Sequence, residues 1–344
     1  MAFDIGMKFM DTASLQKALL NPEIYPDRPK EVGFFETHIS LLFFTGNHVY
    51  KVKKPVDFGF LDFTSLEKRK YFCEQEVKLN RRLSPDIYLG VVAITQDEDQ
   101  VQWGGNGEVI EYAVQMKQIP ENLLMDRLLK NNKVTKDMIE AVSEKLSRFY
   151  LTAETNDYIR HFAKPERFKQ DTDENFDQTR KYIDVTIPQT TYLEVHERTD
   201  QFYRTREDLF YQRIASNWIR DCHGDLRLEH IFWGEEIAIF DCIEFNERLR
   251  YTDVAADIGF LAMDLDYHGR EELSQHLIRT YISNSGDYDL PKVLDFYKCY
   301  RAYVRGKVES FRLDDPNIPE VEKKRSLKRA QEYFELAHRY VLRF

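Results

Sequence analysis

A chain of 344 residues is too long for one simple core, so about two domains or lobes are expected. Hydrophobic residues make up 42% of the chain and charged residues 31%, which is typical of a soluble globular protein. The formal net charge of −10 argues against broad binding of nucleic acid, where Lys and Arg must neutralise phosphates.

The sequence indicates a cytoplasmic protein with no membrane association. No apolar run approaches the ~20 residues that a membrane helix needs. The chain begins without the basic cap and apolar stretch of a signal peptide. Four cysteines, at 73, 222, 242 and 299, form no CxxC pair, which indicates reduced thiols. Nothing in the sequence indicates the oligomeric state.

The N-terminal part of the chain predicts strands with one main helix. Residues 12–21 have the pattern of a short amphipathic helix. Segments rich in β-branched and aromatic residues then predict strands near 32–37, 39–45, 48–53, 87–95 and 109–116. Between the third and fourth strands, residues 65–83 predict a helix that Ser65 can cap. After a connector near 113–120 the pattern is helical to about 220 and again from 253.

The strand VYKVKK, residues 49–54, is the first candidate site. Side chains alternate on a strand, so Val49, Lys51 and Lys53 share one face. On the following helix Glu76 shares a face with two leucines that should pack on the sheet, so it could pair with a strand lysine. Solvated lysines on an edge strand are the alternative, and these residues alone favour it.

The second candidate site is the stretch CHGDLRLEHIFWGEEIAIFDCIEF, residues 222–245, with two His, two Asp and four Glu around two apolar runs. It predicts a hairpin over 230–240 with its turn at Gly234. A hairpin returns the chain to its start, so Asp225, His230 and Asp241 could converge. Close carboxylates repel unless a cation intervenes, and Mg²⁺ prefers such oxygens. A surface hairpin with capping acids is the alternative.

These motifs together resemble the aminoglycoside phosphotransferase-like branch of the protein-kinase-like fold. HGDLRLEH is followed by IFDCIEF, whose Asp lies sixteen positions after the first Asp. The nearer resemblance is to a bacterial group called "aminoglycoside phosphotransferase family enzyme", and the segments ETHISLLFFTGNHVYKVKKPVDFGFLDF, FCEQEVKLNRRLSPDIYLGVV and YRAYVRGKVES contribute to it. The resemblance covers residues from about 30 to 310.

The resemblance implies an α+β, bilobal fold with a small antiparallel-sheet lobe and a larger helical lobe. Its boundaries are an N-terminal helical extension over 1–30, a nucleotide-binding lobe over 31–118, and a helical lobe over 119–344 that holds the catalytic loop and the metal-binding hairpin. The implied activity is transfer of the γ-phosphate of ATP, with Mg²⁺, to a hydroxyl of a small molecule.

The resemblance also implies roles for residues of the catalytic loop and hairpin. His223 and Asp225 would be catalytic, with Asp225 orienting the acceptor hydroxyl or taking its proton. Asp241 would bind the metal, and Asp257 would brace the loop. His230 departs from the pattern, because the family has Asn there; a second metal contact at His230 is therefore open.

For the nucleotide, the resemblance implies that Lys51 contacts the α/β-phosphates, with Glu76 as its helix partner, and that Val49 belongs to the same site. The backbone between Met116 and Ile119 would read the adenine edge. No glycine-rich loop covers the phosphates. The turn ETHIS, residues 36–40, can offer backbone N–H groups and the hydroxyls of Thr37 and Ser40.

The acceptor is a sugar-like or other small hydroxylated metabolite in our interpretation. Arg301 and Arg305 lie one turn apart on a predicted helix and would suit an anionic acceptor, with Glu244 as a further contact. Arginines paired with nearby acids are the alternative. Two other functions stay open: a kinase-like nucleotide-binding module with weak or no catalysis, and a metal-dependent phosphohydrolase.

Overall fold

The computed structural model describes residues 11–98 and 100–344, and the chain divides into two compact units. The first unit runs to Arg127 and also contains Ile231–Asn246. The second unit consists of Leu128–His230 and Glu247–Phe344. The hairpin that we expected in the helical lobe is thus grouped with the strand-rich unit. Residues 1–10 of the expected N-terminal extension lie outside the described residues.

A six-stranded antiparallel sheet forms the centre of the first unit, in the order β1-β2-β3-β6-β4-β5. Its strands are β1 (Gly33–Glu36), β2 (Ser40–Phe44), β3 (His48–Lys53), β4 (Tyr88–Asp97), β5 (Gln100–Trp103) and β6 (Glu108–Lys117). Five of these strands were predicted. The strand β5 was not predicted, because its four residues are too few to show a period.

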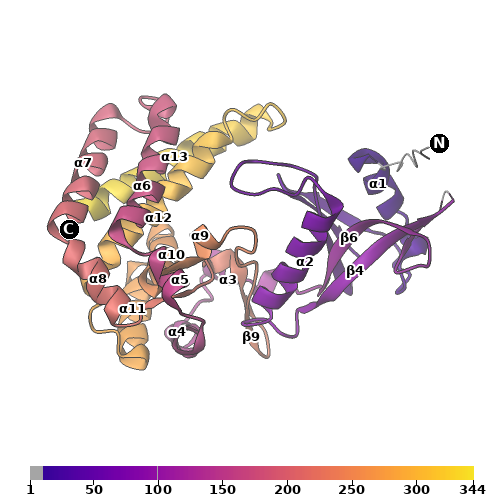
Figure 1. Ribbon diagram of the computed structural model, residues 1–344, viewed down its shortest axis with the longest axis horizontal. Helices are drawn as coiled ribbons and strands as arrows, with labels where there is room; N and C mark the ends of the chain where they lie inside the picture. The colour runs from indigo at the N-terminus through magenta and orange to yellow at the C-terminus, as the bar shows by residue number, and fades with distance from the viewer. Residues whose placement is uncertain (1–10, 99) are drawn as a thin grey trace. The chain divides into compact units, whose positions relative to one another are not determined.

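Each face of this sheet has its own apolar core, as strand alternation predicts. On one face Tyr50 and Val52 of β3 pack with residues of the short helix α1 (Thr12–Leu19). On the other face Val49 packs with Cys73 and Val77 of α2 (Leu66–Asn80). Figure 1 shows α2 lying along the strands β4 and β6.

The helix α2 begins where its capping residue predicts. The Ser65 side chain accepts a hydrogen bond from the backbone N–H of Lys68, which satisfies one of the open donors of the first turn. The small hairpin of β8 (Ile231–Trp233) and β9 (Ile237–Ile239) joins the same core through Phe232 and Ala238. The core therefore links a strand, a helix and a hairpin that are far apart in the sequence.

The second unit is mostly helical. Its longer helices are α4 (Lys136–Thr152), α6 (Pro165–Thr179), α7 (Gln189–Thr205), α8 (Glu207–Ala215), α10 (Val254–Tyr267), α11 (Glu271–Ser285), α12 (Pro291–Phe311) and α13 (Glu320–Val341). The shorter ones are α5 (Asp157–His161) and α9 (Glu247–Arg250), while α3 (Met125–Lys130) spans the boundary of the units. Two three-residue strands, β7 (Ile219–Asp221) and β10 (Tyr251–Asp253), pair with each other and were not predicted. Of the helices in the described ranges, none combines the length and apolar character that crossing a membrane requires.

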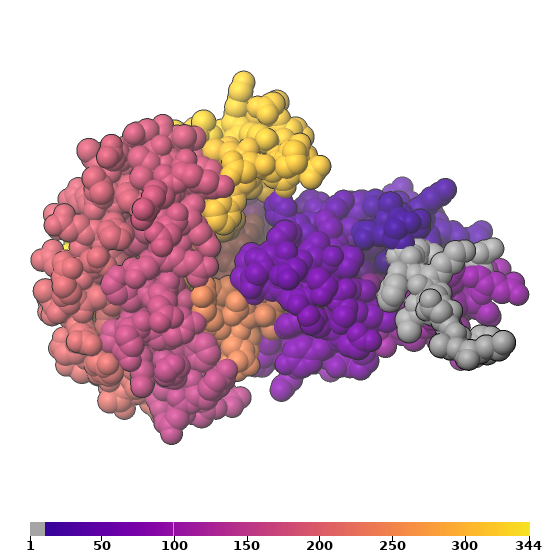
Figure 2. Space-filling view, turned by 45° about the horizontal axis from the view of Figure 1, so that its top comes forward, coloured from indigo at the N-terminus to yellow at the C-terminus, as the bar shows by residue number. Residues whose placement is uncertain are grey.

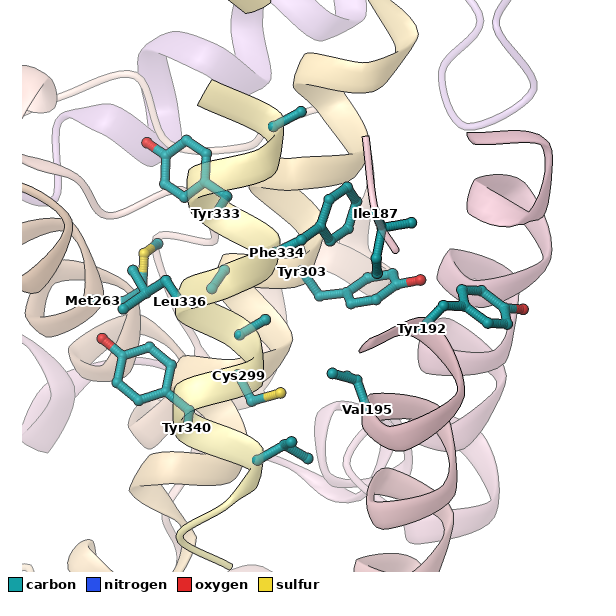
Figure 3. Packing of buried hydrophobic residues seen from close by; sticks show 14 of the residues in the cluster. Ile187, Tyr192, Val195, Met263, Cys299, Tyr303, Tyr333, Phe334, Leu336 and Tyr340 are labelled. Atoms are coloured by element: carbon teal, nitrogen blue, oxygen red, sulfur yellow. The ribbon is translucent and has the colours of Figure 1, made fainter. Parts of the chain in front are cut away.

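The main core of the second unit lies where α12 and α13 pack against α7 and α10. Tyr303 of α12, Phe334 of α13 and Val195 of α7 meet there, and Figure 3 shows their side chains converging. In the space-filling view, side chains fill the gaps that the ribbons leave between the helices of this unit (Figure 2). The α+β fold class is confirmed by this combination of an antiparallel sheet unit and a larger helical unit.

Close packing of α12 on α13 depends on a glycine. A Cβ atom added to Gly306 would lie 2.8 Å from a ring carbon of Phe334, which is itself buried. We expect Gly306→Val to lower the free energy of unfolding by about 1–3 kcal/mol, because the overlap outweighs any gain in helix propensity. Urea denaturation measures this. Val308→Ala, on the exposed side of the same helix, is the control, and an equal loss in both variants would contradict the packing explanation.

Candidate functional site

Two lysines and three carboxylates form a connected cluster in the first unit. Lys51 Nζ lies 2.8 Å from Asp241 Oδ1 and 2.8 Å from Glu76 Oε1. Lys53 Nζ lies 2.6 Å from Glu76 Oε2 and also contacts Glu244. The carboxylate of Glu76 is thus shared by both lysines, and Asp241 and Glu244 complete the two ends.

The main chain near Asp241 is held against the sheet side of the unit by hydrogen bonds. The hydroxyl of Ser84 donates to the carbonyl of Ile239 at 2.6 Å, and the N–H of Cys242 donates to the side chain of Asn80 at 2.9 Å. The N–H of Asp241 donates to the Tyr88 hydroxyl at 3.1 Å. Asp241 itself has a φ of +60°, a left-handed conformation that is uncommon for a non-glycine residue and often occurs at functional sites.

Burial and charge act against each other in this cluster. The Glu76 side chain is 1% exposed and that of Lys53 is 0% exposed, whereas 44% of the Asp241 side chain is exposed. Burial alone would lower the pKa of Lys51, but the Asp241 and Glu76 carboxylates raise it well above its usual value. Burial alone would raise the pKa of Glu76, but Lys51 and Lys53 lower it. Burial raises the pKa of Glu244 despite the contact with Lys53.

The structure pairs Lys51 with Glu76 as we expected, and it shows that Lys53 is a second partner of Glu76. The sequence indicated only that Lys53 shares a strand face with Lys51. Glu244, which we considered as an acceptor contact, is instead buried against Lys53. The edge-strand alternative for these lysines is wrong, because β3 is an internal strand of the sheet and both ammonium groups are paired.

The residues expected to contact the adenine base lie together in the first unit. Val49 is paired with Met116 across β3 and β6, and Ile119 packs against the same apolar cluster. At the end of β6 the N–H of Lys117 donates to a backbone carbonyl at 2.8 Å, and in the connector the N–H of Gln118 does the same at 2.8 Å. Within the described ranges the N–H of Ile119 has no such partner.

The turn between β1 and β2 is closed by its own threonine. The hydroxyl of Thr37 accepts the backbone N–H groups of Ile39 at 3.3 Å and Ser40 at 2.9 Å. The Ser40 side chain is fully buried, and its hydroxyl has no hydrogen-bond partner in the part of the chain that the structure describes. A phosphate role for these two hydroxyls stays a prediction.

In the second unit, a buried aspartate braces the loop that carries HGD. Asp257 accepts the backbone N–H of His223 at 2.7 Å and that of Gly224 at 3.0 Å, and it also accepts the Tyr150 hydroxyl at 3.0 Å. Asp257 is 0% exposed. This is the supporting position expected for it. Gly224 has a φ of +86°, which explains why glycine occupies the turn.

The carboxylate of Asp225 is held by Arg227 through two hydrogen bonds. The Nε atom of Arg227 donates to Oδ1 at 3.0 Å and its Nη2 atom donates to Oδ2 at 2.9 Å. Although burial acts in the opposite direction, the guanidinium holds the pKa of Asp225 well below its usual range. His223 is buried, and its Nδ1 accepts the N–H of Asp225 at 3.3 Å.

His230, predicted as a metal ligand, donates from Nδ1 to the carbonyl oxygen of Asp225 at 2.8 Å. His230 belongs to the second unit and Asp241 to the first. The predicted acceptor residue Arg301 donates to the carbonyl of Ala256 at 3.2 Å and lies over the ring of Phe260.

Arg305 lies 3.6 Å from Glu309, so both predicted acceptor arginines have contacts inside their own unit.

Among the described residues, Asp173, His196 and Asp200 are close enough to one another to hold a metal ion. The ammonium of Lys169 lies 2.5 Å from Asp173 Oδ1 and 2.7 Å from Asp200 Oδ1. A cation therefore already satisfies both carboxylates, and we assign no metal to this group.

The chain is similar in sequence to proteins of two mycobacteria. No family model matches the chain. Uncharacterised proteins of Mycobacterium tuberculosis and Mycobacterium bovis are 33% identical to it over 278 residues, which are 80% of this chain and 54% of each relative. The chain thus spans about half the length of these curated relatives.

A solved choline/ethanolamine kinase family protein from Mesorhizobium loti matches 96% of this chain and 99% of its own, at 12% identity and a TM-score of 0.50. An ADP-bound aminoglycoside phosphotransferase matches 95% of this chain and 99% of its own, at 14% identity and a TM-score of 0.46. The match to the choline/ethanolamine kinase family protein shows that this chain has the same protein-kinase-like fold, which the sequence motifs implied. At such identities the similarity establishes the fold alone.

The brace at Asp257 can be tested by a graded pair of substitutions. Asp257→Ala leaves two buried backbone N–H groups without their acceptor and removes the carboxylate that lies 3.6 Å from Arg301, so we expect a loss of about 2–4 kcal/mol in the free energy of unfolding. Tyr150→Phe removes a single hydroxyl partner and should cost about 1 kcal/mol. Urea denaturation of both variants measures the two losses. If Asp257→Ala were no worse than Tyr150→Phe, Asp257 would not be the brace of this loop.

Proposed function

We propose that this protein is an ATP-dependent phosphotransferase that moves the γ-phosphate to a hydroxyl of a small molecule. The observation that carries the proposal is Lys51, whose ammonium contacts both Glu76 and Asp241. Because Lys51 is held between Glu76 of the helix and the exposed Asp241, its ammonium is already positioned to contact phosphate oxygens. Positioning and charge neutralisation are the main work of phosphoryl transfer.

The donor set of the cluster fits a divalent cation such as Mg²⁺. Two ammonium groups face three carboxylates, so one negative charge is in excess when all five groups are ionised. Both oxygens of the Glu76 carboxylate already face a lysine ammonium, Oε1 toward Lys51 at 2.8 Å and Oε2 toward Lys53 at 2.6 Å. Asp241 exposes its carboxylate to solvent and would be the ligand. When bound, the ion would neutralise charge on the triphosphate.

The adenine would lie against the apolar face that includes Val49, Met116 and Ile119. The N–H of Ile119 is the connector donor with no partner in the described ranges, and the next residue is Pro120, which has no N–H. We therefore expect Ile119 to donate to the base. Of the four residues 116–119 whose backbone was expected to contact the adenine edge, Ile119 is thus the proposed hydrogen-bond donor.

On the acceptor side, Asp225 would orient the hydroxyl that attacks the phosphate. Its lowered pKa makes it a poor proton acceptor, so orientation is the better description of its role. A carboxylate has about four acceptor positions, and Arg227 uses two of them, which leaves room for the hydroxyl. The Asp225 side chain is 28% exposed and can be reached from solvent.

Because Arg227 binds both oxygens of Asp225, a second candidate function is a kinase-like module that binds nucleotide without transferring phosphate.

We expect labelled ATP with Mg²⁺ to transfer phosphate to at least one pool of hydroxylated metabolites, and Asp225→Asn to lower this transfer by about 10²-fold or more. Nucleotide binding without transfer in any pool would support the module instead. Equal transfer by both proteins would show that Asp225 has another role or that a contaminant acts.

The lysine cluster gives an independent prediction. We expect Lys51→Met to lower ATP turnover by about 10²-fold, because the phosphates lose their fixed positive charge. Asp241→Asn should raise the Mg²⁺ concentration needed for half-maximal turnover. Lys70→Met is the matched control, since Lys70 forms an exposed pair with Glu74 on α2. Unchanged turnover in Lys51→Met, measured by release of labelled phosphate, would refute the role of this cluster.

A further inference from the structure

Lys307 of α12 differs from the other cations around it in the kind of partner that it has. Its ammonium lies 2.6 Å from the side-chain oxygen of Asn175 and 2.8 Å from that of Gln178, both on α6. Its remaining contact is with the ring of Phe311, 5.7 Å from Nζ to the ring centre. Over residues 11–98 and 100–344, no carboxylate lies within ion-pair distance of this ammonium.

The neighbouring cations are all paired with acids. Arg248 of α9 contacts Asp171 at 3.1 Å and also Glu174. Further along the same surface, the Arg180 guanidinium lies 2.9 Å from Asp177, and Lys181 lies 2.5 Å from Asp314. The charges of these side chains are therefore largely balanced by direct ion pairs within the protein, whereas the hydrogen bonds of Lys307 in the described ranges go to amide oxygens.

An ammonium group has three N–H donors, and the two amide oxygens use two of them. A partly buried cation without an anion is costly, because amide dipoles replace the lost hydration only in part. The third N–H group and the uncompensated charge both favour a hydrogen bond to an anionic ligand.

The space for such a ligand lies beside these residues. Gln178 and Phe311, two of the contacts of Lys307, also line a hollow of about 660 Å³ together with Asp177, Arg180 and Lys181. This volume lies within the range of small-molecule pockets, about 300–1,000 Å³. The hollow is thus bordered by a polar amide, an aromatic ring, two cations and one acid, Asp177, which is paired with Arg180.

We propose that Lys307, with Asn175 and Gln178, binds the oxyanion group of a small molecule that occupies this hollow, either a carboxylate or a phosphate. The third N–H of Lys307 donates to the ligand oxygen, and the amide oxygens hold the ammonium in place. The site is separate from the Lys51 cluster and does not depend on the phosphotransferase assignment, because it requires neither ATP nor a metal.

Binding of labelled sulfate, measured by equilibrium dialysis at pH 7 and constant ionic strength, tests the site. We expect saturable binding that Lys307→Met weakens by about tenfold or more, because a charge-assisted hydrogen bond is lost. Lys181→Met, which removes a cation of the same hollow that has its own acid, should change it by less than about twofold. No saturable binding, or equal binding by Lys307→Met, overturns the proposal.

Competition then identifies the chemical class of the ligand. Displacement of labelled sulfate by acetate supports a carboxylate ligand, and displacement by inorganic phosphate alone supports a phosphate ligand. If neither anion displaces sulfate, the proposal is overturned. A second variant, Asn175→Asp, puts a carboxylate beside the ammonium and should abolish sulfate binding by neutralising it. Circular dichroism checks that both variants are folded.

The proposed site also predicts how sulfate binding changes with pH. Burial lowers the pKa of Lys307 from its usual 10.5 to about 8; the nearby Glu174 and Asp171 act in the opposite direction and Arg248 in the same direction. Burial raises the pKa of Asp171 to about 6, so this acid is already ionised at pH 8. Sulfate remains a dianion throughout. Binding should therefore fall as pH rises through about 8, and binding that persists unchanged to pH 10 contradicts the site.

Discussion

The carboxylate of Glu76 is shared between two buried lysines, and the arrangement of the strand-rich unit depends on it. A buried carboxylate is tolerated only when cations and hydrogen-bond donors satisfy it. Glu76 meets this condition with one oxygen toward Lys51 and the other toward Lys53. Because the same lysines contact Asp241 and Glu244, the strand β3, the helix α2 and the segment after β9 are held by a single set of charges.

This arrangement separates two tasks within one cluster. Lys53 and Glu244 are both buried, so their pair holds the segment in place without facing solvent. Lys51 and Asp241 are the partly exposed members and can meet a ligand. The inner pair thus stabilises the position of the outer pair. Because removing one member of a buried pair leaves an uncompensated charge, the cluster should respond to substitution as a unit.

The helical unit positions its candidate catalytic loop by the same physical means. Asp257 takes two backbone N–H groups at the start of the loop, and Asp264 takes the N–H of Leu228 at 2.9 Å further along. Arg227 then fixes the carboxylate of Asp225 within the loop. Buried acids that bind backbone N–H groups restrict a loop more than apolar contacts do, because hydrogen bonds are directional. Lys307, held by amides, follows a different principle that leaves its charge available.

Local patterns in the sequence were enough to predict five strands of the main sheet, the helices near 12–21 and 65–83, the alternation that puts Lys51 and Lys53 on one face, and the motif that contains Asp225 and Asp241. These features depend on local periods and spacings. Four features became visible only in the folded chain: Glu76 contacts both lysines, Glu244 is buried, the hairpin of β8 and β9 packs with the sheet unit, and Lys307 has amide partners. Contacts across as many as 191 residues are decided by packing, which no local period encodes, and strands of three or four residues are too short to show a period at all.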